Sequence, residues 1–236
     1  MLKKIETATE NKKQRDELFS TFEKIAREAT GDPTVEVVPK EYGATNGRII
    51  YYPFFDEDFY IAPLRVLYGW LYHEIGHILE EKTHVEQGLL GAIALVKLGV
   101  ASTPIKKFFL NAFEDVRMER VQSALNPFVA KNLLAANQYF AKRLHARFKS
   151  VDLNNFDAPS TKFWHVIGCA IIRQARDEDM TWLPPSCVFC IDAIKEEIDA
   201  SADAFCAEDC FDLSLLAIKK IFVALDKKGF VLEEAE

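Results

Sequence analysis

From residue 63 almost to the end of the chain, apolar residues recur at the three- and four-residue spacing of one helix face. Pro63 and Pro104 suit the first turn of a helix, and Ser102 and Thr103 supply capping hydroxyl groups just before Pro104. We expect helices at residues 63–82, 85–99, 104–125, 127–149, 159–177, 187–200 and 203–227. A further amphipathic helix is expected over residues 1–30, ending before Gly31.

Only residues 34–53 carry a strand pattern. Residues 34–39 and 48–52 are rich in β-forming residues, and the pair Asn46-Gly47 between them is a turn signal. This segment predicts a hairpin or a small antiparallel sheet. The expected fold is therefore mainly α with a small antiparallel β element (α+β), as a single domain over residues 1–236.

Composition narrows the classes of function. The chain of 236 residues has 29 basic and 36 acidic residues and a net charge of −7, which disfavours a specific nucleic-acid partner. Its longest apolar stretch runs from Gly88 to Ser102, is interrupted by Lys97 and is too short to span a membrane. The N-terminus has no apolar signal segment, and five cysteines are an odd number for a disulfide framework. We expect a cytoplasmic protein without a membrane partner; its oligomeric state is not indicated.

The motif that carries chemistry is His73-Glu74-Ile75-Gly76-His77, an HExxH. On a helix, His73 and His77 lie on one face, one turn apart, and can bind one Zn²⁺. Glu74 is rotated by about 100° from His73, which suits a general base acting on an activated water. The alternative is a helix with two structural histidines and a surface Glu. The metzincin pattern would require a His where Thr83 stands, so His84 is expected on the surface or in a loop.

A third ligand would have to come from the helix at residues 104–125. Glu114 and Asp115 lie there among apolar residues, where a buried acid needs a partner such as a metal ion. Asp115 and Glu119 share a face, and so do Glu114 and Arg117. These residues could equally form an ordinary charged face with pairs inside the helix. The spacing does not decide between Glu114 and Asp115.

The HExxH is followed by N-x-x-E-D-x-R-x-E at residues 111–119 and preceded by residues 45–53, TNGRIIYYP. This combination resembles the zincin-type domain of phage and plasmid proteins and a segment of the CobT subunit of aerobic cobalt chelatase. The resemblance covers about residues 42–120, and the chain has no room for the von Willebrand A domain that usually follows in CobT-type proteins.

The resemblance implies a gluzincin-like zinc metallopeptidase that acts on a peptide or protein, in the host cytoplasm if the chain is encoded by a phage. Its catalytic part would span residues 34–125, and a helical C-terminal part would span residues 127–236. Glu114 would be the third zinc ligand and Asp115 an alternative ligand or a group that orients a ligating His. Glu119 and Arg117 would support the ligands or face the substrate.

Zincin folds place the edge of a sheet beside the active-site helix, so a substrate could pair with the strand at residues 48–52. Tyr52 or Arg117 could then stabilise an oxyanion, although plain strand packing is the simpler expectation for Tyr52. Two other classes of function stay open. One is a non-hydrolytic zincin-fold adaptor or assembly module, and the other is a helical domain without a metal.

Two cysteine pairs lie near the C-terminus. Cys187 and Cys190 form a C-x₂-C, and Cys206 and Cys210 form a C-x₃-C after a short gap. This spacing allows a second, structural zinc site. The alternatives are a disulfide or, more simply, thiols packed in the core.

Overall fold

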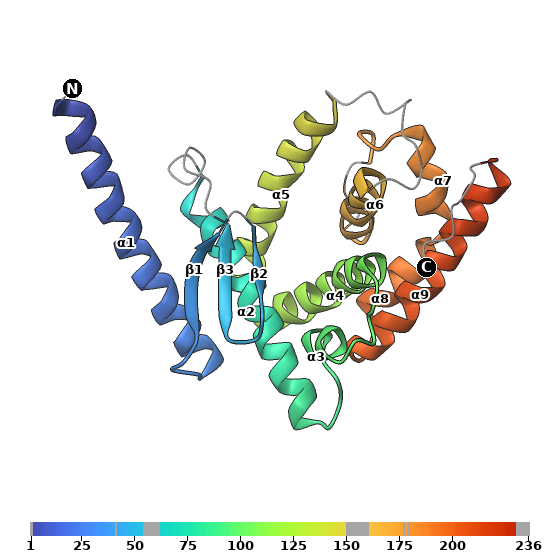
Figure 1. The fold of residues 1–236 in the computed structure, drawn as a ribbon, viewed down its shortest axis with the longest axis horizontal. Helices are drawn as coiled ribbons and strands as arrows, with labels where there is room; N and C mark the ends of the chain where they lie inside the picture. The colour runs from blue at the N-terminus through green and yellow to red at the C-terminus, as the bar shows by residue number, and fades with distance from the viewer. Residues whose placement is uncertain are drawn as a thin grey trace. The chain divides into compact units, whose positions relative to one another are not determined.

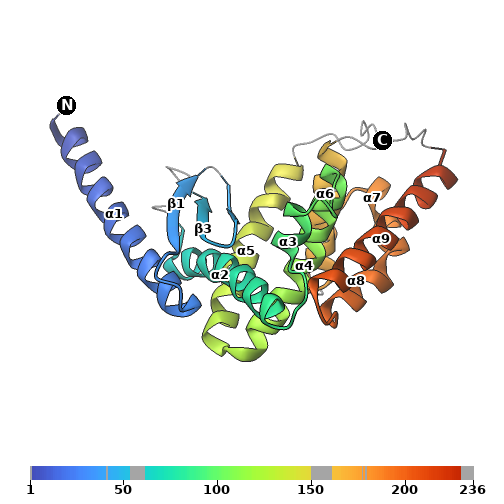
Figure 2. The same ribbon diagram turned by 60° about the horizontal axis from the view of Figure 1, so that its bottom comes forward.

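The computed structural model describes residues 2–40, 42–53, 62–149, 161–176, 178 and 180–229 (Figures 1 and 2). These residues are mainly helical with one small sheet, as predicted. The elements in chain order are α1 (Leu2–Thr30), β1 (Glu36–Lys40), β2 (Ala44–Thr45), β3 (Ile49–Pro53), α2 (Leu64–Glu86), α3 (Ala92–Lys97), α4 (Pro104–Leu125), α5 (Pro127–Lys149), α6 (Thr161–Gln174), α7 (Pro185–Ala193), α8 (Lys195–Ala202) and α9 (Ala207–Lys227). Within these ranges, no helix has both the length and the apolar character needed to traverse a bilayer.

The chain divides into two compact units. The first comprises Met1–Glu80 with Pro127–Asn137, and the second comprises Glu81–Asn126 with Gln138–Glu236. Two of the three points of division fall inside helices, because α2 and α5 each contribute residues to both units. The single domain expected from the sequence stays a prediction.

The sheet of the first unit has the strand order β1-β3-β2. The turn at Asn46-Gly47 joins β2 to β3, and these two strands pair antiparallel. The Asn46 side chain accepts hydrogen bonds from the backbone N–H groups of Arg48 and Ile49, and Gly47 has a φ of 92° that favours glycine. The predicted turn is therefore confirmed, but it closes a shorter hairpin than expected.

The two longer strands, β1 and β3, pair parallel, with Glu36 opposite Ile49. The sheet is thus mixed rather than antiparallel, because the chain passes through β2 before it enters β3. This order also makes β3 the central strand. The expectation that residues 48–52 offer a sheet edge to a substrate is corrected, since β3 has a neighbouring strand on each side.

Alternate residues of β3 anchor the sheet to α2 within the first unit. Ile50 and Tyr52 are fully buried, and the Tyr52 hydroxyl donates a hydrogen bond of 2.8 Å to the backbone oxygen of Leu67. The start of α5 also packs closely against α2. A Cβ atom on Gly69 would lie only 2.2 Å from the backbone oxygen of Asn132, so only glycine fits at this crossing.

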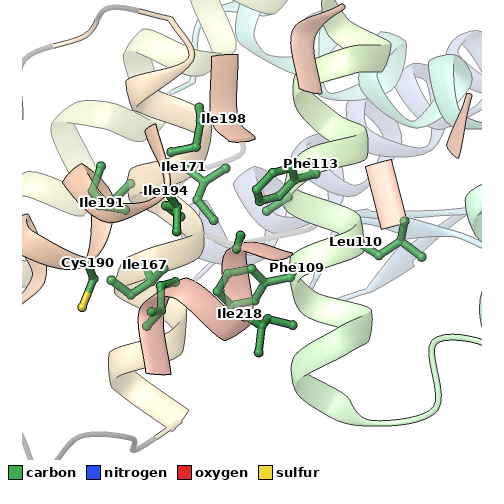
Figure 3. Close-up of a cluster of buried hydrophobic side chains, with 14 of the residues drawn as sticks. Phe109, Leu110, Phe113, Ile167, Ile171, Cys190, Ile191, Ile194, Ile198 and Ile218 are labelled. Carbon is green, nitrogen blue, oxygen red and sulfur yellow. The ribbon is translucent and has the colours of Figure 1, made fainter. Parts of the chain in front are cut away.

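The core of the second unit surrounds α4 (Figure 3). Phe109 and Phe113 of α4 lie among apolar side chains from α6, α7, α8 and α9. Where α4 and α6 meet, Gly168 leaves space for the Phe108 ring. Polar residues of a helix that is buried on several sides need hydrogen-bond or ion-pair partners, so the environments of the acidic residues of α4 indicate what they bind.

Several helix boundaries differ from the expected ones. The helix expected at residues 187–200 is two helices, α7 and α8, which meet at Ile194. The helix expected at residues 85–99 is reduced to α3, because α2 continues to Glu86. Glu81 of α2 accepts hydrogen bonds from the backbone N–H groups of Ile93 and Ala94 and so caps the start of α3.

Candidate metal centre

The two histidines of the HExxH lie on α2 within the first unit. Leu71, Ile75 and Ile78 are buried, which fixes the rotation of the helix, and the half-buried His73 and His77 lie on the neighbouring face. Their Nε2 atoms are 3.3 Å apart, and their ring planes make an angle of 85°. The predicted arrangement of two imidazoles on one helix face is therefore present.

The distance between the two Nε2 atoms provides a test of fit for a metal ion. Two nitrogen ligands bound tetrahedrally at about 2.0–2.1 Å from Zn²⁺ lie about 3.3 Å apart. His73 and His77 have this separation without any rearrangement. The same distance also allows a hydrogen bond between the rings, in which one Nε2 donates and the other accepts. The pair therefore suits a metal ion and is also compatible with a metal-free state.

Glu74 follows His73 on the same helix, and its residue is only 7 % exposed. The rotation of about 100° per residue separates its carboxylate from the ligand face. The role of general base expected for Glu74 stays a prediction.

The acids of α4 lie in the second unit, where each has a different environment. Asp115 is buried, and its Oδ2 accepts a hydrogen bond of 3.2 Å from the Asn111 side-chain amide. Asp115 belongs with His73 and His77 to the group of described residues that could hold a metal ion, each offering one ligand atom. Two imidazoles and one carboxylate are a donor set typical of zinc.

Glu114, which the resemblance favoured as a ligand, is held by Arg117. The Arg117 guanidinium donates two hydrogen bonds to the Glu114 carboxylate, from Nε at 2.9 Å and from a terminal nitrogen at 2.7 Å. Both side chains are almost completely buried. A buried carboxylate needs a partner of opposite charge, and Arg117 supplies it without a metal ion.

Glu119 also has a basic partner. Its carboxylate forms an ion pair with Arg176, which in turn lies near Glu178. The Arg173 guanidinium forms an ion pair with the Glu178 carboxylate and lies over the ring of Trp182. This network ties the C-terminal half of α4 to the segment that follows α6.

The two residues suggested for oxyanion stabilisation are core groups in the structure. Tyr52 is fully buried, its hydroxyl donates to Leu67, and burial raises its pKa. Arg117 is buried and engaged by Glu114. The suggested role of Tyr52 and Arg117 at a substrate is therefore corrected, since each polar group already stabilises the interior.

The four C-terminal cysteines are buried and free of disulfides. In the described part of the chain, their sulfur atoms do not come together in a metal-binding group. Burial and the neighbouring Cys187 raise the pKa of Cys190 to about 12, and burial raises the pKa of Cys210. The possible structural zinc at Cys187, Cys190, Cys206 and Cys210 is thus corrected to thiols packed in the core, the simpler of the expectations.

His84 lies at a different place from the one expected. It is 2 % exposed, and its Nε2 accepts a hydrogen bond of 3.3 Å from the backbone N–H of Ala207, at the start of α9. This N–H has no partner inside its own helix, so His84 satisfies it. Sequence spacing gave no signal of this contact, because the two residues are far apart in the chain.

Asn111 was part of the motif at residues 111–119, but no role was assigned to it. Its spacing of four residues from Asp115 was the available signal for their hydrogen bond.

Comparisons of the chain with protein-family models, curated proteins and solved structures gave no match.

Proposed function

We propose that this protein binds one Zn²⁺ through His73, His77 and Asp115 and hydrolyses peptide bonds. The observation that supports the proposal most is the 3.3 Å separation of the two Nε2 atoms, which suits two ligands of one tetrahedral ion. A carboxylate completes the three protein ligands of a catalytic site, so that a fourth position stays available for water or substrate.

Asp115 is a better third ligand than Glu114. The carboxylate of Glu114 is neutralised by two hydrogen bonds from Arg117, and a cation would have to displace a buried guanidinium to bind there. Asp115 accepts a hydrogen bond from the neutral amide of Asn111, which orients the carboxylate without supplying a positive charge. We therefore assign the ligand role to Asp115 and a structural role to Glu114.

When bound, zinc would supply Lewis acidity, which polarises a carbonyl group and makes a water molecule more acidic. Glu74 would take a proton from the attacking water on its carboxylate and pass it to the nitrogen of the leaving amine. His73, His77 and Asp115 would hold the zinc ion in a fixed position relative to Glu74.

The first experiment measures the zinc content of the purified protein after metal loading and dialysis. The wild-type chain should hold one zinc, and His77→Ala should hold none. His165→Ala is the matched control, since it removes an exposed histidine from α6 and should leave the zinc content unchanged.

The second experiment tests hydrolysis with a peptide library analysed by mass spectrometry. Glu74→Gln should keep its zinc and lose cleavage, because the amide cannot accept the proton. Zinc binding without cleavage by the wild type would refute the peptidase and favour the non-hydrolytic module. A folded wild type without zinc would refute the metal site itself.

A further inference from the structure

Three polar residues of α4, Asn111, Asp115 and Glu119, follow one another at intervals of four and so lie along one stripe of the helix. Asp115 and Glu119 are buried, whereas Asn111 is exposed. The Asn111 amide reaches from the surface to the buried carboxylate and donates a hydrogen bond of 3.2 Å to its Oδ2 atom.

We propose that Asn111 is a positioning residue for the metal centre and acts on the metal only through Asp115. This inference rests on the proposed function, in which Asp115 is a zinc ligand. The hydrogen bond fixes the rotation of the carboxylate about its Cβ–Cγ bond and distinguishes its two oxygens. Oδ2 accepts from the amide, and Oδ1 is the oxygen that would bind zinc.

The chemistry of the donor supports this role. A neutral amide orients a carboxylate without cancelling its charge, whereas a guanidinium does both. The neighbouring pair shows the contrast, since Arg117 neutralises Glu114 on the same helix. Partners that orient metal ligands in this way typically contribute a factor of about 10 to 100 in metal affinity.

Helix propensity does not favour an asparagine at this position. Asn is less favourable than Ala inside a helix, and Asn111 lies in the interior of α4 and is exposed. Replacement by Ala would improve the helix propensity slightly, but it would also remove a hydrogen bond from the buried Asp115 carboxylate, so a modest loss of stability is expected in the metal-free protein. A residue with only a structural role would lower the stability without changing the affinity of the folded protein for zinc.

The test is a double-mutant cycle on zinc affinity, measured by competition with a chromophoric chelator. It compares the wild type, Asn111→Ala, Asp115→Ala and the double variant, and thermal unfolding of each metal-free protein is recorded in parallel. Asn126→Ala is the matched control, because it removes an exposed asparagine at the far end of α4, about 16 Å from Asp115 along the helix axis.

Asn111→Ala should weaken zinc binding about 10- to 100-fold, whereas its effect on thermal stability should be modest. It should have no further effect once Asp115 is Ala, and Asn126→Ala should bind zinc like the wild type. An unchanged affinity in Asn111→Ala, with Asp115→Ala impaired, would overturn the positioning role alone. An equal loss in the Asp115→Ala background would overturn it as well, since Asn111 would then not act through Asp115.

The failure of the proposed function gives a different pattern. If Asp115→Ala binds zinc as tightly as the wild type, or if the wild type binds none, the ligand set is wrong and the inference about Asn111 fails with it.

Discussion

Gly69 is the residue at which the structure predicts the sharpest effect of a single added methyl group. In Gly69→Ala, the new Cβ would lie 2.2 Å from the backbone oxygen of Asn132 and 2.6 Å from the Cβ of Ala136. A carbon and a carbonyl oxygen normally approach no closer than about 3.3 Å, so the start of α5 would have to move away from α2 by about 1 Å. A backbone atom cannot turn aside as a flexible side chain can.

The magnitude follows from two opposing effects. Ala stabilises a helix interior by about 1 kcal/mol relative to Gly. Overpacking of a tight site costs about 1–3 kcal/mol, and a backbone obstacle places this site at the upper end. We expect a net loss of about 2 kcal/mol, which corresponds to a decrease in Tm of about 4–8 °C for a chain of this length.

The assay is thermal and urea unfolding of the metal-free protein, followed by circular dichroism. Gly168→Ala is the matched control, because its nearest neighbours are atoms of the Phe108 ring, which can shift, and its loss should be smaller. Ala136→Gly should rescue Gly69→Ala only in part, since it leaves the contact with Asn132 in place. A Gly69→Ala protein as stable as the wild type would refute the reasoning, and full rescue by Ala136→Gly would show that the carbonyl is not the obstacle.

Three further predictions concern metal binding, the buried ion pair and pH. Zinc at 100 times its Kd should stabilise the wild type by about 2.7 kcal/mol; a thermal shift should detect this, and an equal shift in His77→Ala would contradict the site. Glu114→Gln should cost about 3–5 kcal/mol in urea unfolding because it leaves the buried Arg117 charge without its counterion; Glu114→Gln with Arg117→Met should recover much of the loss, and an additive effect of the two changes would argue against the pair. The pKa of Cys190 is raised from 9.0 to about 12, so the folded state keeps a proton that the unfolded state releases. The contribution of this thiol to the free energy of unfolding should therefore be fully present below pH 9 and decrease between about pH 9 and 12. A Cys190→Ala variant with the same decrease would exclude this thiol as its cause.

The sequence predicted those parts of the fold that depend on local signals. Thr103 and Pro104 begin α4 as expected, with the Thr103 side chain accepting a hydrogen bond from the backbone of Lys106. The spacing of His73 and His77 placed both rings on one helix face. Each of these features is decided within about one helical turn, where residue type and spacing are sufficient.

Features that depend on distant partners were not predictable in the same way. The Asn46-Gly47 turn was identified, but no local signal showed that β3 would receive β1 on its other side. The break at Ile194 has neither glycine nor proline to mark it, so one helix was expected where the chain forms two. Such outcomes are decided by tertiary packing rather than by propensity.

The adjacent acids Glu114 and Asp115 show the same limit at the candidate site. The spacing showed that Glu114 shares a face with Arg117 and that Asp115 shares a face with Glu119, but it did not indicate which acid would have a basic partner. In the structure, the Arg117 guanidinium donates hydrogen bonds to Glu114 from two of its nitrogens. The direction in which two neighbouring side chains leave a buried helix depends on what surrounds it.

The buried cysteines allow the local unfolding of individual helices to be measured. A thiol that no solvent reaches can react with an alkylating reagent only when the helix that carries it opens, so the labelling rate reports the free energy of that opening. Cys187 lies on α7 and Cys210 on α9, and mass spectrometry distinguishes the two peptides. Equal rates would identify α7 and α9 as one cooperative unit, and unequal rates would show which of the two helices separates first from the core around α4.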